Sequence, residues 1–241
     1  MVTSLSDVSE AILRDWAHDL AQKRIPKPWE HVSSSGQSLV ARNRECDLYC
    51  KTYFPRSRTG SIKRKLRNSR LLHATKNGVL LTRYGIDAPQ TVLYGTLPRG
   101  GEYLFMRTAA GLNLFEQLQA LEANPQHLLA NKRRLLHDLG TFLGRVHATG
   151  FAHGNPSAEH IITRQVEDRF TFAFINIEQC RRQVPLAGRK MLQDLRALHT
   201  AILPGISTTD RLRFLHAWRL QMRHLSATDV AIMLRALDAR R

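Results

Sequence analysis

The spacing of apolar residues divides the chain into a strand-rich first part and a helix-rich second part. In residues 7–23, Ile12, Trp16 and Leu20 recur every four positions, which predicts an amphipathic helix. Residues 55–85 have the pattern of a loop followed by a helix that ends near Gly85. The other elements expected in this part are strands within 31–42, 47–54, 86–97 and 101–109, and a helix over 111–124.

The second part opens with the strongest helical pattern in the chain, over residues 127–150. Its apolar face consists of Leu135, Leu139, Phe142, Leu143 and Val146. Gly150 is a natural stop for this helix. Two strands at 161–165 and 170–176 follow, and the pattern after residue 187 is helical, with Ser226 or Thr228 as candidate cap of the last helix.

This order of elements predicts an α+β fold with two lobes. We expect a small β-rich N-terminal lobe with an extra N-terminal helix over residues 1–107, and a mostly helical C-terminal lobe over 108–241, with a hinge near "MRTAAG". A hydrophobic fraction of 43% is enough for buried cores in a chain of this length. No apolar run approaches the roughly 20 residues that span a bilayer, and the N-terminus lacks a secretory pattern.

The cysteines indicate a reducing compartment, and we expect a cytoplasmic protein. The chain has three of them, an odd count without metal-type pairing. Cys46 and Cys50 lie four residues apart in a strand-like stretch, where they share a face, and we interpret them as buried thiols rather than a ligand pair.

The chain has a large excess of basic residues, many of them in one stretch. The formal net charge is +16, and no acidic residue occurs between Asp47 and Asp87. The basic residues of that window are Lys51, Arg56, Arg58, Lys63, Arg64, Lys65, Arg67, Arg70, Lys76 and Arg83. Such a field attracts polyanions such as nucleic acid, anionic lipid, phosphorylated glycan or an acidic protein. Among these we expect an anionic glycolipid, the inner face of the cytoplasmic membrane or an acidic protein as partner. A solvated basic face is the simpler alternative, and the chain lacks the interleaved aromatic residues typical of RNA binding.

The stretch "FAHGNPSAEH" resembles the catalytic loop of a phosphotransferase, with one residue changed. Kinase-type phosphoryl transfer needs a loop over the phosphates, a strand lysine, a base aspartate and metal ligands. Here Gly36 lies in a short loop, "SSSGQS", and Lys51 lies in a strand. Asn155 stands at the base position, two residues after His153. His160 and Asn176 occupy the positions of the two metal ligands.

These motifs resemble the bacterial lipopolysaccharide core kinases, the Kdo/heptose kinase family with a protein-kinase-like fold. The similar strings are "CKTYF", "YGIDAP", "HGN" and "INIEQCR", within roughly residues 30 to 200. The resemblance implies ATP and Mg²⁺ as cofactors. It implies nucleotide contacts at Gly36, Lys51, Met106 and Thr108, catalytic positions at His153 and Asn155, and metal positions at His160, Asn176 and Glu178. It also makes Asp194 a structural anchor of the loop.

The chain lacks all three acidic residues of the expected ATP site. The amide of Asn155 has no useful basicity, and Asn176 gives up the charge that Mg²⁺ prefers. Residues 51–86 contain no glutamate to pair with Lys51. A carboxylate could come from Glu159 or Glu178, the latter because residues two apart share a face in a strand.

Each candidate also has a purely structural interpretation. Lys51 suits any strand, His153 and His160 are often core histidines, Asn155 favours a turn before Pro156, and Glu178 suits an ion pair.

Three functions follow. The first is a catalytically impaired member of the lipopolysaccharide kinase family, a pseudokinase that binds or regulates in envelope glycolipid assembly. The second is an active phosphotransferase that uses displaced carboxylates on a core sugar. The third is a basic polyanion-binding module, in which nucleic acid is not the partner we expect. We favour the first, because similarity indicates the lineage while the residues at the chemical positions do not support the ordinary mechanism.

Overall fold

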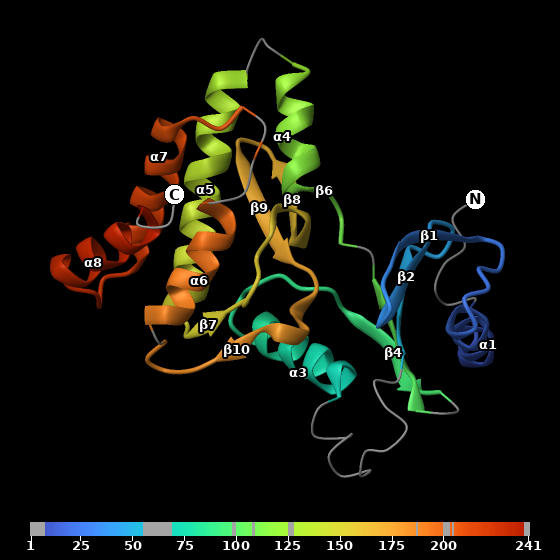
Figure 1. Cartoon of the computed structure of the whole chain (residues 1–241). Helices are drawn as coiled ribbons and strands as arrows, with labels where there is room; N and C mark the ends of the chain where they lie inside the picture. The colour runs from blue at the N-terminus through green and yellow to red at the C-terminus, as the bar shows by residue number, and fades with distance from the viewer. Residues whose placement is uncertain are drawn as a thin grey trace. The chain divides into compact units, whose positions relative to one another are not determined.

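The computed structural model describes residues 8–54, 69–97, 100–107, 109–124, 128–186, 188–199, 203 and 205–238 (Figure 1). The chain divides into two compact units. The first comprises Met1–Val79 and Pro89–Thr108, and the second comprises Leu80–Ala88 and Ala109–Arg241. Strands dominate the first unit and helices the second, as expected for an α+β fold. The lobe boundary between residues 107 and 108 stays a prediction.

The first unit is built on a five-stranded antiparallel sheet in the order β1-β2-β3-β5-β4. Its strands are β1 (Trp29–Ser34), β2 (Ser38–Asn43), β3 (Leu48–Tyr53), β4 (Thr91–Thr96) and β5 (Glu102–Arg107). The run expected as one strand at 31–42 is therefore a hairpin, because the polar residues at its centre form a turn. The strand expected from residue 86 begins only at Thr91, after Pro89, whose ring removes a backbone donor.

Helix α1 (Glu10–Ala21) covers one face of this sheet through Leu13, Ala17 and Leu20. The face expected from Ile12, Trp16 and Leu20 is wrong at its start, since Ile12 is 42% exposed. A strict four-residue step drifts around a helix of 3.6 residues per turn, whereas the observed spacing of four and then three follows it.

Helix α3 (Arg70–Arg83) packs on the opposite face of the sheet, where Leu71 and Ala74 contact Tyr53 and Leu104. It crosses from the first unit into the second and ends close to Gly85, as expected; the φ of Gly85 is +68°. Cys46 and Cys50 are free thiols buried in the core beneath α1, and burial raises the pKa of Cys50 to about 12. The interpretation as buried thiols is confirmed.

The second unit consists of helices and a small antiparallel sheet, which α4 (Leu114–Glu122) and α5 (Leu128–Ala148) contact (Figure 1). Its other helices are α6 (Gly188–His199), α7 (Thr208–Gln221) and α8 (Ala227–Asp238). Its sheet has the order β6-β8-β9, from β6 (Leu112–Asn113), β8 (Ile161–Val166) and β9 (Arg169–Phe174). A second pair joins β7 (Phe151–Ala152) to β10 (Arg181–Arg182).

Helix α5 forms the centre of this unit. Its predicted apolar face is confirmed, since Leu135, Leu139, Leu143 and Val146 are buried in the core. On another side α5 lies against α7, where a Cβ added to Gly140 would stand 2.2 Å from the carbonyl oxygen of Phe214. The helix ends before Gly150, which has a φ of +88° and is the predicted stop.

The C-terminal helices occur where the pattern placed them. The Ser226 hydroxyl caps α8 by accepting the N–H of Asp229 at 3.1 Å, which confirms the first of the two predicted caps. Among the described residues, no helix is long and apolar enough to cross a membrane.

Candidate active site

The loop from His153 to His160 follows β7 and is fixed to α6 by one buried carboxylate. Asp194 accepts the backbone N–H of His153 at 2.7 Å and that of Gly154 at 2.8 Å. The side chain of the neighbouring Gln193 donates to the Gly154 carbonyl at 2.6 Å. Asp194 is fully buried, so its charge is compensated by these donors rather than by water. The expected role of Asp194 as loop anchor is confirmed.

A third hydrogen-bond donor to Asp194 is His147 of α5, which itself accepts a hydrogen bond from Trp218 of α7. The indole N–H of Trp218 donates to Nδ1 of His147 at 3.0 Å. That acceptor role leaves the ring proton of His147 on Nε2, which lies 3.3 Å from Asp194. The sequence alone gave no indication of His147, because its partners lie 47 and 71 residues further along the chain.

His153 connects the loop to the end of β9. Its Nε2 donates to the carbonyl of Ile175 at 2.9 Å, and its Nδ1 accepts the N–H of Asn155 at 3.3 Å. Burial lowers the pKa of His153, against the opposing effect of the Ile175 hydrogen bond and of the Asp194 and Glu178 charges. A neutral ring with both nitrogens engaged holds the loop in shape and has no free position for a proton from substrate.

His160 closes the other end of the loop. Its Nδ1 donates to the Asn155 carbonyl at 3.0 Å, and its ring stacks on His153 with 6.0 Å between centroids. The same carbonyl accepts the N–H of Ser157 at 2.9 Å. Asn155 itself is exposed, so its side chain lies at the surface. Its backbone N–H and its carbonyl are both hydrogen-bonded. The loop thus presents an amide side chain from a rigid backbone.

Asn176 is in a left-handed conformation, with φ 57° and ψ 42°, immediately before a turn of 3-10 helix over Ile177–Gln179. Asparagine tolerates this region better than most residues. Because β9 ends at Phe174, the strand periodicity that was expected to align Glu178 with Asn176 does not apply. The argument for Glu178 as a replacement ligand therefore loses its geometric basis, although its charge still acts on His153.

The candidate nucleotide residues Gly36, Lys51 and Met106 belong to the first unit. Lys51 lies in β3 between Val40 and Leu104, on the face that α3 covers, with its Nζ 5.5 Å from the ring centroid of Tyr53. Met106 is half-buried in β5 and pairs with Tyr49. Thr108 lies outside the described residues.

The turn at Gly36 uses its backbone amides internally. The Ser35 hydroxyl accepts the N–H groups of Gln37 and Ser38 at 3.2 and 3.1 Å, and the Ser35 N–H donates to the Ser38 carbonyl at 2.8 Å. A phosphate-binding loop presents such N–H groups to the ligand instead. This turn is closed as a hairpin connection.

The donor set of the second unit does not fit Mg²⁺. Of the three positions expected to hold the ion, His160 offers an imidazole and Asn176 an amide, and only Glu178 offers the carboxylate oxygen that Mg²⁺ favours. Within the residues that the structure describes, no group of three histidine, cysteine or acidic side chains is arranged to hold a metal. His160 and Asn176 thus lack the negative charge that Mg²⁺ favours, and strand geometry does not align Glu178 with Asn176.

A comparison of the sequence with models of protein families identifies the family of this chain. The profile of the lipopolysaccharide kinase (Kdo/WaaP) family matches residues 33–218, which is most of the chain. The chain belongs to this family. No curated protein matched the sequence in a separate comparison.

Solved structures confirm the kinase-like fold of this family member. WaaP, in a structure titled as a complex with acyl carrier protein, aligns with a TM-score of 0.63 at 18% identity, over 96% of this chain and 97% of that one. WbdD bound to the kinase inhibitor LY294002 aligns with a TM-score of 0.50 at 15% identity, over 87% of this chain and 49% of that chain. At these identities the likeness concerns the fold alone.

Proposed function

We propose that this lipopolysaccharide kinase family member is a pseudokinase, which serves as a binding or regulatory partner in envelope glycolipid assembly. The observation that carries the proposal is the loop at 153–160. Asp194, His153 and His160 hold its backbone through four hydrogen bonds, and a fifth joins His153 to the Ile175 carbonyl, yet the residue it presents is Asn155. The backbone of the loop is held by several hydrogen bonds, but its exposed side chain cannot act as a base. Such a loop is better suited to binding than to proton transfer.

The changes at the base position and at the metal position should both lower the rate of phosphate transfer. Loss of general-base assistance costs about 10²–10⁴ in rate, and the metal position has lost its charge as well. The closed turn at Gly36 removes amides that would otherwise cradle phosphates. Lys51, Met106 and Thr108 remain the proposed nucleotide contacts if ATP binds at all.

The proposed partner is acidic. The net charge of +16 favours an acidic protein or an anionic membrane or glycolipid surface. The structure of WaaP is titled as a complex with acyl carrier protein, which makes such a carrier protein the first partner to test. We place the protein in the cytoplasm, at the inner face of the membrane.

Calorimetric titration of the full chain with ATP, in the presence and absence of Mg²⁺ and Mn²⁺, tests the proposal. We expect no metal-dependent binding and no transfer of labelled phosphate to core glycolipid. Asn155→Asp combined with Asn176→Asp should leave the cellular phenotype of the wild-type gene unchanged. Phosphate transfer by the unaltered chain would overturn the pseudokinase proposal.

An active phosphotransferase is the second candidate, and one observation favours it. Glu178 is half-buried and close enough to raise the pKa of His153 by its charge, so a carboxylate does lie near the loop. If Glu178 holds a metal, ATP binding should require Mg²⁺ or Mn²⁺ and should be lost in Glu178→Gln. Glu167→Gln, at an exposed glutamate in the turn between β8 and β9, is the matched control.

A further inference from the structure

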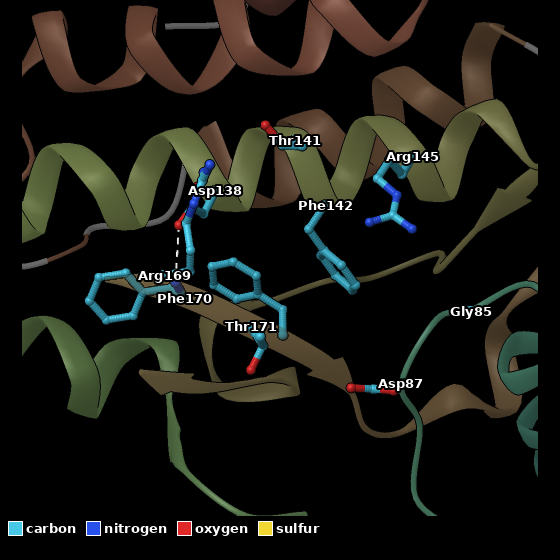
Figure 2. A pocket seen from close by; sticks show the side chains of 10 residues that line it. Gly85, Asp87, Asp138, Thr141, Phe142, Arg145, Arg169, Phe170 and Thr171 are labelled. Atoms are coloured by element: carbon cyan, nitrogen blue, oxygen red, sulfur yellow. Dashed lines mark hydrogen bonds and ion pairs between the residues drawn. The ribbon is translucent and has the colours of Figure 1, made fainter. Parts of the chain in front are cut away.

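A pocket of about 290 Å³ lies in the second unit, between α5, the first residues of β9 and the segment 85–87 (Figure 2). None of the loop residues 153–160 lines it. Its volume is close to the lower limit of small-molecule pockets, so it suits a ligand of few atoms. The proposed pseudokinase function has no use for this pocket.

The edge of β9 gives the pocket a backbone donor. In the antiparallel ladder with β8, alternate residues point their N–H groups away from the partner strand. Phe174 donates outward to the Asp87 carbonyl at 3.1 Å, and Phe170 donates outward to Asp138 at 3.0 Å. Phe172 lies between them with its N–H in the same direction, and no described residue accepts it.

Only some of the charged side chains around the pocket form ion pairs with described residues. Asp138 is buried and is satisfied by Arg169 at 3.1 Å and by the Phe170 N–H. Arg145 on α5 and Asp87 on the segment 85–87 make no ion pair with each other or with any other described residue. One unpaired cation and one unpaired anion thus lie at the same pocket.

The wall beside these charges is aromatic. Phe142 packs against Phe172 with 5.4 Å between ring centroids, and Phe142 is only partly buried. Figure 2 shows Arg145 extending from α5 beside Phe142, and Asp87 pointing from its segment toward the pocket. A small ligand that meets all these groups carries a carboxylate, an ammonium group and a compact apolar body.

We propose that this pocket binds a small zwitterion of the amino-acid class with an apolar side chain. Arg145 and the Phe172 N–H receive the carboxylate, Asp87 receives the ammonium group, and Phe142 and Phe172 contact the apolar body. Hydrogen bonds to ionised groups are stronger than those between neutral groups. Arg145 and Asp87 are both exposed, so their charges are reached from solvent at the mouth of the pocket. The proposal is independent of whether the protein transfers phosphate.

Four probes with the same phenyl body separate the contributions: phenylalanine, 3-phenylpropionate, 2-phenylethylamine and N-acetylphenylalaninamide. The ¹⁵N-labelled full chain is titrated with each, and the amide resonances of Phe172 and Ala173 report on binding. We expect phenylalanine to bind most tightly, and each probe with a single charge to bind about tenfold more weakly. The uncharged amide should be the weakest.

Two variants assign the charges. Arg145→Gln should remove the preference for phenylalanine over 2-phenylethylamine, and Asp87→Asn should remove the preference over 3-phenylpropionate. Arg133→Gln, at an exposed arginine of the same helix outside the pocket, is the matched control and should change neither preference. Equal binding of all four probes, no binding of phenylalanine, or an equal effect of the control variant would each overturn the proposal.

Discussion

At the scale of single residues, Asp194 decides whether the loop at 153–160 exists. Its buried carboxylate accepts two backbone N–H groups and faces the buried His147. In Asp194→Asn the new NH₂ group opposes one of these donors, so a buried donor loses its acceptor. We expect the free energy of unfolding to fall by about 2–4 kcal/mol, measured by urea denaturation. Asp168→Asn, at a carboxylate that is 90% exposed, should change it by less than about 0.5 kcal/mol.

His153 gives the protein a pH dependence at the same scale. Burial lowers its pKa in the folded state, so below the unfolded value of 6.5 the unfolded chain binds a proton that the folded chain does not. Stability should therefore be fully present above about pH 6.5 and decline as the pH falls below it, in denaturation curves between pH 8 and 5. His153→Gln should flatten this part of the curve. Burial acts to raise the pKa of Asp210, but hydrogen bonds from Ser207 and Lys132 together outweigh this effect and lower it. The pKa of Asp229 is lowered by hydrogen bonds from the serine that caps α8. Both groups lose their stabilisation only around and below pH 3.8.

At the scale of elements, the contact between α5 and α7 depends on glycine. A Cβ at Gly140 would meet the Phe214 carbonyl oxygen at 2.2 Å, so Gly140→Ala must push the two helices apart. We expect a loss of about 1–3 kcal/mol, seen as a lower thermal midpoint in circular dichroism. Gly188→Ala is the control at the start of α6, where an added Cβ meets nothing within 4 Å. A similar drop in both variants would show that the close approach is not the cause.

The elements also show what local pattern can predict. The apolar face of α5, the stop at Gly150 and the cap at Ser226 depend on neighbouring residues, and all were predicted correctly. The 3-10 turn after β9 was missed because it depends on Asn176 in a left-handed conformation, which apolar spacing does not report. The hydrogen bond between Trp218 and His147 could not be predicted for a different reason, because these residues meet only after distant helices pack. The roles of the candidate site residues rest on resemblance and stay a prediction, whereas their hydrogen bonds could not be predicted from the sequence.

At the scale of the whole molecule, charge and chemistry point in the same direction. The proposed binding function depends on the net charge of +16, which favours an acidic partner, and on Asn155 at the expected base position. If the partner is an acyl carrier protein, attraction between opposite charges should dominate the association. Calorimetric titration at 50 and 300 mM NaCl should then give a dissociation constant that rises by at least about tenfold, because the Debye length falls well below 10 Å at the higher salt.

The same titration separates the two kinds of anionic partner. Vesicles that contain phosphatidylglycerol should bind the protein with a similar salt dependence if the membrane surface is the target, while neutral phosphatidylcholine vesicles serve as the control. A carrier protein offers side-chain contacts besides charge, so part of its affinity should survive at 300 mM NaCl, whereas a purely electrostatic membrane association should be lost there. Binding to the carrier protein that does not change with salt would contradict the charge-based argument, since it would mean that the excess of basic residues plays no part in the contact.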